Sequence, residues 1–428
     1  MWKIKNEISK ISWIWEKFNI EWFLNVHKTI SKELSYSPLW NEIWIHENID
    51  ISASINIFKD NRKLILKIEN VSLKNIEKLI KDNLFLLEIS DKDEDNVLYP
   101  VNDKTFLDSR KFQINDIKWD FFVSQWEKIK NFQFKDKLSI EWFGYSLSEQ
   151  ESYFINSKGA YKEQQWSYCN YSLALFYNDE NFSDSDYMVK YSTINDDITD
   201  DFLNEIQEKI LKKTNPQESF LSSGSHDIVI KNELAAEFWE LLMSACSWEN
   251  IRQNQSFFSK DDIWKIITNK DISVISNPKK DDSVFNRLFD SEWITTEKIT
   301  IIENWSLKNI FLNSKNAKKF NLKPTWNPDY ANLEIIWKYD SDYLSGCSFV
   351  FTSFLWMHTI DSTTWKFALE WEWFEINDWK VWNFVKNVWF SWNIKDLFLN
   401  LDKIWNDTYT YWNVFSPSLS FKNQTLIF

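Results

Sequence analysis

Glycine is nearly missing from this chain, and tryptophan is in large excess. The 428 residues contain 4 Gly and 27 Trp, whereas glycine normally supplies about 7% of a globular protein. Together the two residue types make up about 7% of this chain. Tight turns need residues that adopt a positive φ, and glycine does so freely. A chain with so little glycine is therefore severely restricted in the turns that it can make.

The tryptophans stand where turn residues are expected. One follows Asn377-Asp378, another follows Glu303-Asn304, and six directly precede an asparagine, at positions 40, 326, 382, 392, 405 and 412. Read as glycine, these stretches become ordinary turn sequences such as NDGK and ENGS. The simplest interpretation is that most of the Trp positions are glycines in the native protein, because some bacteria read the codon UGA as glycine. It predicts that Trp379 and Trp405 lie at exposed turns. The alternative is a truly Trp-rich, carbohydrate-binding protein.

Charge and cysteine content exclude several classes of protein. The net charge of −14 and the pI near 5.0 argue against a general binder of nucleic acid or anionic membranes. Three scattered cysteines, Cys169, Cys246 and Cys347, suit a reducing compartment and predict no disulfide framework. The N-terminal stretch has no continuous apolar core, and no run of eighteen apolar residues follows. We therefore expect a cytoplasmic protein.

Apolar periodicity indicates a mixture of strands and helices. Alternating or β-rich runs predict strands at 51–60, 63–70, 167–179 and 226–230, and helical spacing predicts helices at 72–90, 200–213, 232–245 and 394–404. Asp60-Asn61 is the expected hairpin turn, Asn232 is the expected helix cap, and 214–226 is the best linker. We expect an α+β fold. Residues 1–215 would form a sheet-plus-helix domain, and residues 216–428 a mainly antiparallel, barrel-like β domain with a few helices.

No compact catalytic motif stands out from the residues alone. The four histidines, His27, His46, His226 and His358, are far apart in sequence, which favours turn or surface roles over metal ligation. The SGSH stretch at 223–226 is weak evidence for a serine nucleophile, because a triad is defined by geometry. Neither a P-loop nor a GxGxxG motif appears, even with Trp read as Gly. Asp290, Glu292 and Glu303 suggest paired carboxylates, but a role in fixing turns is favoured.

With Trp read as Gly, the C-terminal half resembles the TldD/PmbA family, also called the modulator of DNA gyrase family. The stretches that carry the resemblance are RLFDSEWITTEK (287–298), IIENWSLKNIF (301–311), PTWN (324–327), INDWKVWN (376–383), SWNIKDLFLNL (391–401), IWND (404–407) and SPSLSF (416–421). INSKGAYKEQQ (155–165) is similar to a strand-turn of the N-terminal half. The sequence departs from the pattern at Phe384, where the family has proline, and the segment 332–364 is short.

The resemblance implies a zinc peptidase system. The family's catalytic subunit carries H-E-x-x-x-H on a helix and completes its zinc site with a late cysteine, a ligand set suited to activating water. In this chain Asn232 stands near the first histidine position, and Glu237 or Phe238 near the second. Glu233 remains, and 404–421 contains no cysteine. The pattern resembles the PmbA (TldE) branch, so no catalytic or metal-binding residue is expected on this chain.

The same resemblance supplies the remaining expectations. The matching motif positions, expected to be structural, are Asp290, Glu292, Glu303, Asn304, Asn327, Asn393, Asn406 and Asp407. The partner is expected to be a TldD-like, zinc-carrying catalytic subunit in a heterodimer, or a second copy in a homodimer, and the substrate an extended peptide. A stand-alone peptide-binding or regulatory protein is the alternative.

Overall fold

The computed structural model describes residues 19–427, apart from 69–71, 95, 97, 99–100, 264, 269–270, 305, 326–329, 339–343, 345, 355–364 and 379. These residues divide into two compact units. The first contains the described residues up to Leu211 together with Glu292–Ile294, and the second contains those of Lys212–Ser291 and from Thr295 onward. Among the described residues, no helix is both long and apolar enough to cross a membrane.

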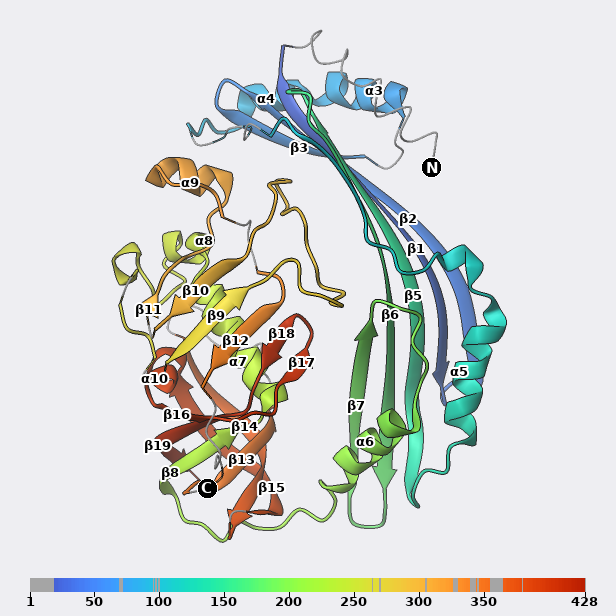
Figure 1. Cartoon of the computed structure of the whole chain (residues 1–428), viewed down its shortest axis with the longest axis vertical. Coiled ribbons are helices and arrows are strands. Elements are labelled where there is room, and N and C mark those ends of the chain that lie inside the picture. The colour runs from blue at the N-terminus through green and yellow to red at the C-terminus, as the bar shows by residue number, and fades with distance from the viewer. Residues whose placement is uncertain are drawn as a thin grey trace. The chain divides into compact units, whose positions relative to one another are not determined.

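The first unit is built on a seven-stranded sheet (Figure 1). Its order is β3-β2-β1-β5-β6-β4, and β7 also pairs with β6. All pairings are antiparallel except that of β4 with β6. The strands are β1 (Glu21–Ser37), β2 (Glu42–Lys59), β3 (Arg62–Ile68), β4 (Lys104–Asp108), β5 (Leu138–Asn156), β6 (Tyr161–Asn178) and β7 (Ser183–Ser192).

Two hydrophobic clusters pack on this sheet. One lies beneath α3 and α4 and includes Ile76, Ile80 and Leu87. The other lies beneath α5 and α6 and includes Phe122 and Ile206. The strands contribute side chains at every second position, as the pleat requires. The helical elements of this unit are α3 (Leu73–Asn83), α4 (Phe85–Ile89), η1 (Ile114–Asp116), α5 (Trp119–Asn131) and α6 (Asp200–Leu211).

The second unit holds two six-stranded sheets, ordered β11-β10-β9-β12-β18-β17 and β15-β14-β13-β8-β19-β16. A short pairing also joins β15 to β19. The strands are β8 (Gly224–Ile230), β9 (Ile272–Ser276), β10 (Ile299–Glu303), β11 (Ser306–Leu307), β12 (Leu333–Trp337), β13 (Phe349–Phe354), β14 (Lys366–Asn377), β15 (Lys380–Asn393), β16 (Leu401–Ile404), β17 (Tyr409–Tyr411), β18 (Val414–Ser416) and β19 (Leu419–Ile427). The helices are α7 (Asn232–Ala245), α8 (Trp248–Arg252), η2 (Lys260–Asp262), α9 (Ser314–Phe320) and α10 (Ile394–Leu399).

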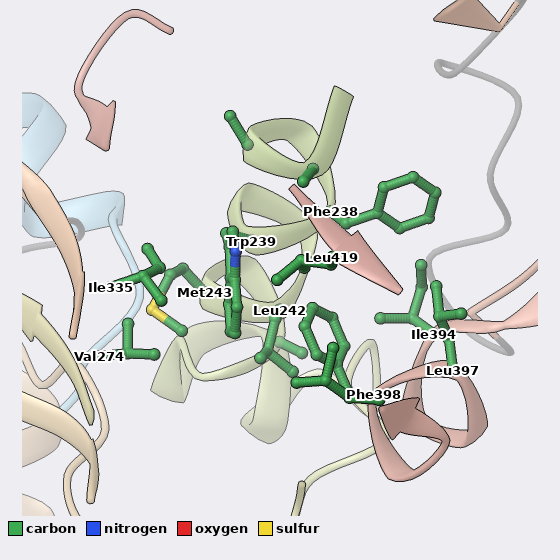
Figure 2. Packing of buried hydrophobic residues seen from close by; sticks show 14 of the residues in the cluster. Phe238, Trp239, Leu242, Met243, Val274, Ile335, Ile394, Leu397, Phe398 and Leu419 are labelled. Atoms are coloured by element: carbon green, nitrogen blue, oxygen red, sulfur yellow. The ribbon is translucent and has the colours of Figure 1, made fainter. Parts of the chain in front are cut away.

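Helix α7 joins both sheets into a single core. Figure 2 shows Met243 beside Val274 of β9, and Leu242 on the side of α10. Trp239 is fully buried, and its ring centroid lies 4.6 Å from that of Phe398. Burial of each such side chain contributes roughly 1.5–3 kcal/mol. The core therefore fixes α7, and with it the start of the helix, against strands from both sheets.

The α+β class is confirmed by the mixed helix and sheet content. The described strands of the second unit divide between two sheets, and in one of them the short β15–β19 pairing joins strands that the main strand order separates. The barrel-like description of this unit stays a prediction. The predicted helix at 394–404 is wrong in its second half, because 401–404 forms β16 and pairs with β19. The predicted helix at 72–90 is divided into α3 and α4 at Leu84.

At three places, the two residues that connect a pair of antiparallel strands include a tryptophan. The pairs Glu303↔Ser306, Asn377↔Lys380 and Tyr411↔Val414 each leave two residues between their strands. Two-residue loops favour type I′ or II′ turns, and type I′ needs a positive φ at both central residues. The predicted Asp60-Asn61 turn between β2 and β3 has this geometry, with φ of 50° and 62°. Each of the other three turns contains a tryptophan.

Tryptophan itself adopts a positive φ at three described positions. The values are 61° at Trp293, 57° at Trp365 and 49° at Trp412. Residues with bulky side chains rarely adopt a positive φ, because this left-handed conformation costs roughly 1–2 kcal/mol for a residue that carries a Cβ. Trp405 is half-buried, so the prediction that it lies at an exposed turn is wrong. Its main-chain N–H donates a hydrogen bond to the carbonyl of Ser418, which precedes β19. Trp379 lies outside the described residues.

Candidate functional site

The start of α7 is the position to which the family resemblance assigns a metal-binding helix. Strand β8 leads directly into α7, and its last residue, Ile230, pairs with Leu419 of β19. This pairing places Ser418 beside Asn232. Asp407 comes from the loop between β16 and β17 and meets both residues. Three segments that are far apart in the sequence therefore converge at one helix end.

A hydrogen-bonded network joins Asn232, Asp407 and Ser418. The Asp407 carboxylate accepts from the Ser418 main-chain N–H at 2.8 Å and from its hydroxyl at 2.6 Å. The Asn232 side-chain amide donates to the Asp407 carbonyl at 2.6 Å and more weakly to its carboxylate at 3.3 Å. The main-chain N–H of Asn232 donates to the Ser418 hydroxyl at 3.0 Å. We call these three residues the α7 network.

Asn232 stabilises the helix start in a different way from the one predicted. Lys231 is the cap, and Asn232 is the first helical residue. The Asn232 side-chain oxygen accepts from the Glu233 main-chain N–H at 2.8 Å. The side-chain oxygen of Asn232 therefore accepts a hydrogen bond from the helix, and its side-chain nitrogen donates one to Asp407.

Burial controls the charge of Asp407. Removal from water raises the pKa of its carboxyl, while hydrogen bonds from Ser418 and the positive charge of Lys231 act in the opposite direction. The ionised form thus depends on its donors. Loss of those donors would leave a buried carboxylate without compensation.

A second acidic group lies further along the same helix. Glu233, Glu237 and Glu240 are spaced at four and three residues, so they share one face of α7. Burial, followed by the negative charges of Glu240 and Glu233, raises the pKa of the Glu237 carboxyl to about 7. Glu240 accepts a hydrogen bond from the Tyr330 hydroxyl at 3.2 Å. Glu237 therefore changes charge near neutral pH.

The residues at the start of α7 do not fit a zinc centre. Zinc sites in proteins use imidazole nitrogen, thiolate sulfur and carboxylate oxygen. The α7 network offers an amide, a hydroxyl and one carboxylate whose oxygens already accept hydrogen bonds from the protein. Across the part of the chain that the structure describes, no group of three His, Cys, Asp or Glu residues could hold a metal ion.

Most of the other predicted motif positions lie at turns. Glu303 is exposed at the end of β10 and forms an ion pair with Lys308 at 3.5 Å. Asn304 follows in the hairpin turn with φ 47°. The Asn393 side chain accepts from the Lys395 main-chain N–H at 2.9 Å, which caps α10. Asn406 is exposed beside Asp407.

The remaining motif positions are Asp290, Glu292 and Asn327. Asp290 and Glu292 are half-buried and belong to different units. Asn327 lies outside the described residues. Among the motif positions that the structure describes, Asp407 is the one that bonds to Asn232.

The histidines and cysteines form no metal or nucleophile cluster among the described residues. His226 contacts the main-chain oxygen of Ser222, at 2.9 Å, so the SGSH stretch makes a local turn contact. His46 pairs with Glu33, and the Nδ1 atom of His27 lies 2.8 Å from the Ser152 hydroxyl. His358 lies outside the described residues. The three cysteines form no disulfide.

Sequence reasoning missed Ser418 as a member of the site. Ser418 lies in the SPSLSF stretch (416–421), which is one of the stretches that carry the family resemblance. That motif gave no indication that its second serine faces the start of a helix 186 residues earlier.

Comparison with known proteins shows which proteins this chain resembles. Residues 223–427 match the family described as PmbA/TldA metallopeptidase C-terminal domain. The Metalloprotease PmbA homolog of Buchnera aphidicola subsp. Acyrthosiphon pisum is 24% identical over 301 residues, which is 66% of this chain and 65% of that relative. The match therefore spans just under two thirds of the length of that curated relative.

Solved structures share the fold over nearly the whole chain. TldE from Thermococcus kodakarensis has a TM-score of 0.83 at 15% identity, covering 99% of this chain and 100% of that one. A Thermotoga maritima protein described as a modulator of a DNA gyrase has a TM-score of 0.84 at 17% identity, covering 99% of each chain. Together the comparisons show that residues 223–427 resemble the PmbA/TldA metallopeptidase C-terminal domain and that the chain shares its fold with these solved structures.

Proposed function

We propose that this chain is the non-catalytic subunit of a TldD–PmbA-type metallopeptidase complex that acts on peptides or unfolded protein segments. The observation that carries the proposal is the α7 network. At the helix start where the resemblance implies a zinc ligand, an amide, a hydroxyl and a carboxylate bind one another.

Zinc hydrolysis needs a bound water that the metal acidifies, held by three protein ligands. Neither Asn232 nor Ser418 is a usual zinc ligand, and Asp407 is already stabilised by Ser418 and Asn232. The zinc would instead be held by a TldD-like partner, and this chain would help to enclose and align an extended peptide. Strand addition suits that role, because main-chain hydrogen bonds give affinity with little sequence preference. The cytoplasm remains the proposed location.

The purified chain alone should bind no stoichiometric zinc and should not hydrolyse an unfolded protein. The measurement is metal content by mass spectrometry after dialysis against zinc, together with cleavage of a casein-type substrate. One tightly held zinc per chain, with cleavage that a chelator abolishes, would show that the chain is catalytic. A TldD-like chain with its H-E-x-x-x-H helix, handled identically, is the positive control for zinc binding.

We also propose that most of the Trp positions are glycine in the native protein. The positive φ of Trp412 and the three hairpin turns that contain tryptophan support this. The buried Trp239, whose indole N–H has no hydrogen-bond partner, supports it as well, since an unsatisfied buried donor costs roughly 1–3 kcal/mol. Trp239 also packs closely against Phe398, so the proposal does not extend to every tryptophan.

Peptide mass spectrometry of the native protein tests the recoding proposal. The tryptic peptides 381–386 and 387–395, VWNFVK and NVWFSWNIK, contain Trp382, Trp389 and Trp392. We expect each to have the mass of its glycine form. The peptide 214–231, which has no Trp, should match the printed sequence either way. Recovery of both Trp-containing peptides at their tryptophan masses would contradict the proposal.

A further inference from the structure

A run of lysines stands out in a chain that is acidic overall. The chain has 63 Asp and Glu residues against 49 Lys and Arg residues. Across residues 304–328, however, there are five lysines and no Asp or Glu. Four of these lysines lie on the short helix α9 or just after it, at positions 315, 318, 319 and 323. We call these four residues the α9 patch.

Helix α9 presents its lysines on the side away from the core. Ala317 is 1% exposed and belongs to the hydrophobic core, and Asn316 beside it is 2% exposed. Lys318 and Lys319 are exposed. Residues three and four positions apart are neighbours on a helix surface, so Lys315 lies beside both of them. One side of α9 is therefore anchored, while the other carries positive charge.

The loop after α9 is fixed at both ends. The main-chain N–H of Leu322 donates to the carbonyl of Ala317 at 2.8 Å, and that of Thr325 donates to the carbonyl of Leu312 at 3.0 Å. Lys323 lies between these two hydrogen bonds. Binding costs less when the groups that make the contact are already ordered. The main chain that carries Lys323 therefore needs little ordering when a ligand binds.

The helix dipole accounts for only part of the patch. Positive side chains in the last turn stabilise a helix, and Lys318 and Lys319 lie there. Lys315 and Lys319 are four residues apart, a spacing at which like charges destabilise a helix. Lys323 lies beyond the end of the helix, so it adds charge without helping to stabilise α9. The positive charge thus exceeds what the stability of α9 requires.

The acidic group that contacts α9 from α8 is already balanced. Glu249 accepts a weak hydrogen bond from the side-chain amide of Asn316, at 3.5 Å. It also pairs with Arg252 of its own helix. Hydrogen bonding to Arg252 is the main reason why the pKa of the Glu249 carboxyl is lowered to about 2. The Glu249–Arg252 pair therefore adds no net negative charge to this surface.

We infer that the α9 patch binds an acidic segment of another polypeptide. Complementary charge selects acidic partners and speeds their encounter. The seven residues of α9 span about 10 Å, which fits a segment of a few residues. Leu322, 55% exposed beside Lys323, offers this segment an apolar contact. A long nucleic acid fits less well, because beyond the patch it meets a chain whose net charge is −14. The inference depends on neither a catalytic partner nor a metal.

Peptide binding tests the inference. The probe is a fluorescently labelled peptide, Glu-Glu-Asp-Leu-Glu-Glu, and its neutral counterpart is Gln-Gln-Asn-Leu-Gln-Gln. Fluorescence anisotropy with the full chain should show saturable binding of the acidic peptide that weakens as salt is added. The neutral peptide should bind about tenfold more weakly. Equal binding of the two peptides, or no binding of the acidic one, would overturn the inference.

Charge reversal tests where the peptide binds. The double variant Lys319→Glu/Lys323→Glu changes two exposed residues, so it should keep its circular dichroism spectrum and bind the acidic peptide about tenfold more weakly. Lys319→Gln/Lys323→Gln removes the charges without reversing them and should lie between this variant and the unmodified chain. The matched control is Lys74→Glu/Lys78→Glu on the exposed face of α3, which should change binding less than about twofold. Equal losses in the α3 and α9 glutamate variants would contradict the assigned site.

A nucleic acid probe distinguishes the two classes of polyanion. A labelled single-stranded DNA hexamer should bind the unmodified chain more weakly than the acidic peptide at the same salt concentration. Tighter binding of the hexamer, lost in Lys319→Glu/Lys323→Glu, would show that the patch recognises phosphate rather than an acidic polypeptide.

Discussion

Replacement of Glu237 by glutamine is expected to stabilise the protein strongly above neutral pH. An unfolded glutamate ionises near pH 4.5, whereas the folded state keeps the proton until pH about 7. Between these values the folded state binds more protons than the unfolded state, so stability falls as pH rises through this range. The difference corresponds to about 3 kcal/mol at pH 8. Glu237→Gln removes that cost and keeps the shape of the side chain.

Urea unfolding at pH 4.5 and pH 8 measures this effect. Glu237→Gln should raise the free energy of unfolding by about 3 kcal/mol at pH 8 and change it little at pH 4.5. Glu205→Gln on the exposed face of α6 is the matched control and should stay within about 0.5 kcal/mol at both pH values. Equal effects of Glu237→Gln at the two pH values would mean that its charge is not the cause.

Replacement of Asp407 by alanine is expected to destabilise the second unit. Asp407 accepts from both donors of Ser418 and from the Asn232 side chain. Ser418 is nearly fully buried, at 2% exposure, so its groups would lose their acceptor without gaining water. Hydrogen bonds to charged groups, and buried donors left unsatisfied, each account for roughly 1–3 kcal/mol. We expect a loss of about 3 kcal/mol.

Urea unfolding measures the effect of Asp407→Ala: the midpoint should fall while the m-value stays unchanged. Asn406→Ala changes the neighbouring exposed residue and should cost less than about 0.5 kcal/mol. Asp407→Asn should lie between the two, because its amide keeps one acceptor oxygen but replaces the other with a donor. If Asp407→Ala is as stable as Asn406→Ala, the α7 network does not hold the helix start.

Local elements of the fold could be predicted from the sequence where the periodicity and the tertiary pairing agree. Local sequence patterns were enough to predict β3, α6 and the Asp60-Asn61 turn. Residues 394–404 show where agreement fails. The apolar spacing there is helical, but pairing of 401–404 with β19 outweighs it. Tertiary contacts of this kind leave no periodic signal in the segment itself.

The candidate site could be predicted only in part. The resemblance placed Asn232 and Asp407 among its motifs, but no spacing rule brings together residues 175 positions apart. The pairing of β8 with β19 does so, and a strand pairing is specified by the whole sheet. The raised pKa of Glu237 likewise depends on burial. The spacing of Glu233 and Glu240 relative to Glu237 can be read from the sequence, but the burial of Glu237 cannot.

The side of β2 that has no neighbour among the described strands was not predicted, because alternation in a strand does not reveal which side remains unpaired. Residues 51–60 were recognised as a strand, whereas the exposed stretch before them was not. The described part of β3 ends at Ile68, which pairs with Ala53 of β2. No described strand pairs with this side of Glu42–Ser52.

The central claim is that this chain supports peptide hydrolysis through a catalytic partner. The most direct measurement compares cleavage of an unfolded protein by this chain, by a TldD-like chain from the same genome, and by the two together. The account predicts strong cleavage by the mixture, none by this chain, and loss of all cleavage when a histidine of the partner's H-E-x-x-x-H helix is replaced by alanine. Full activity of the partner without this chain, or failure of the two to co-purify, would contradict the account.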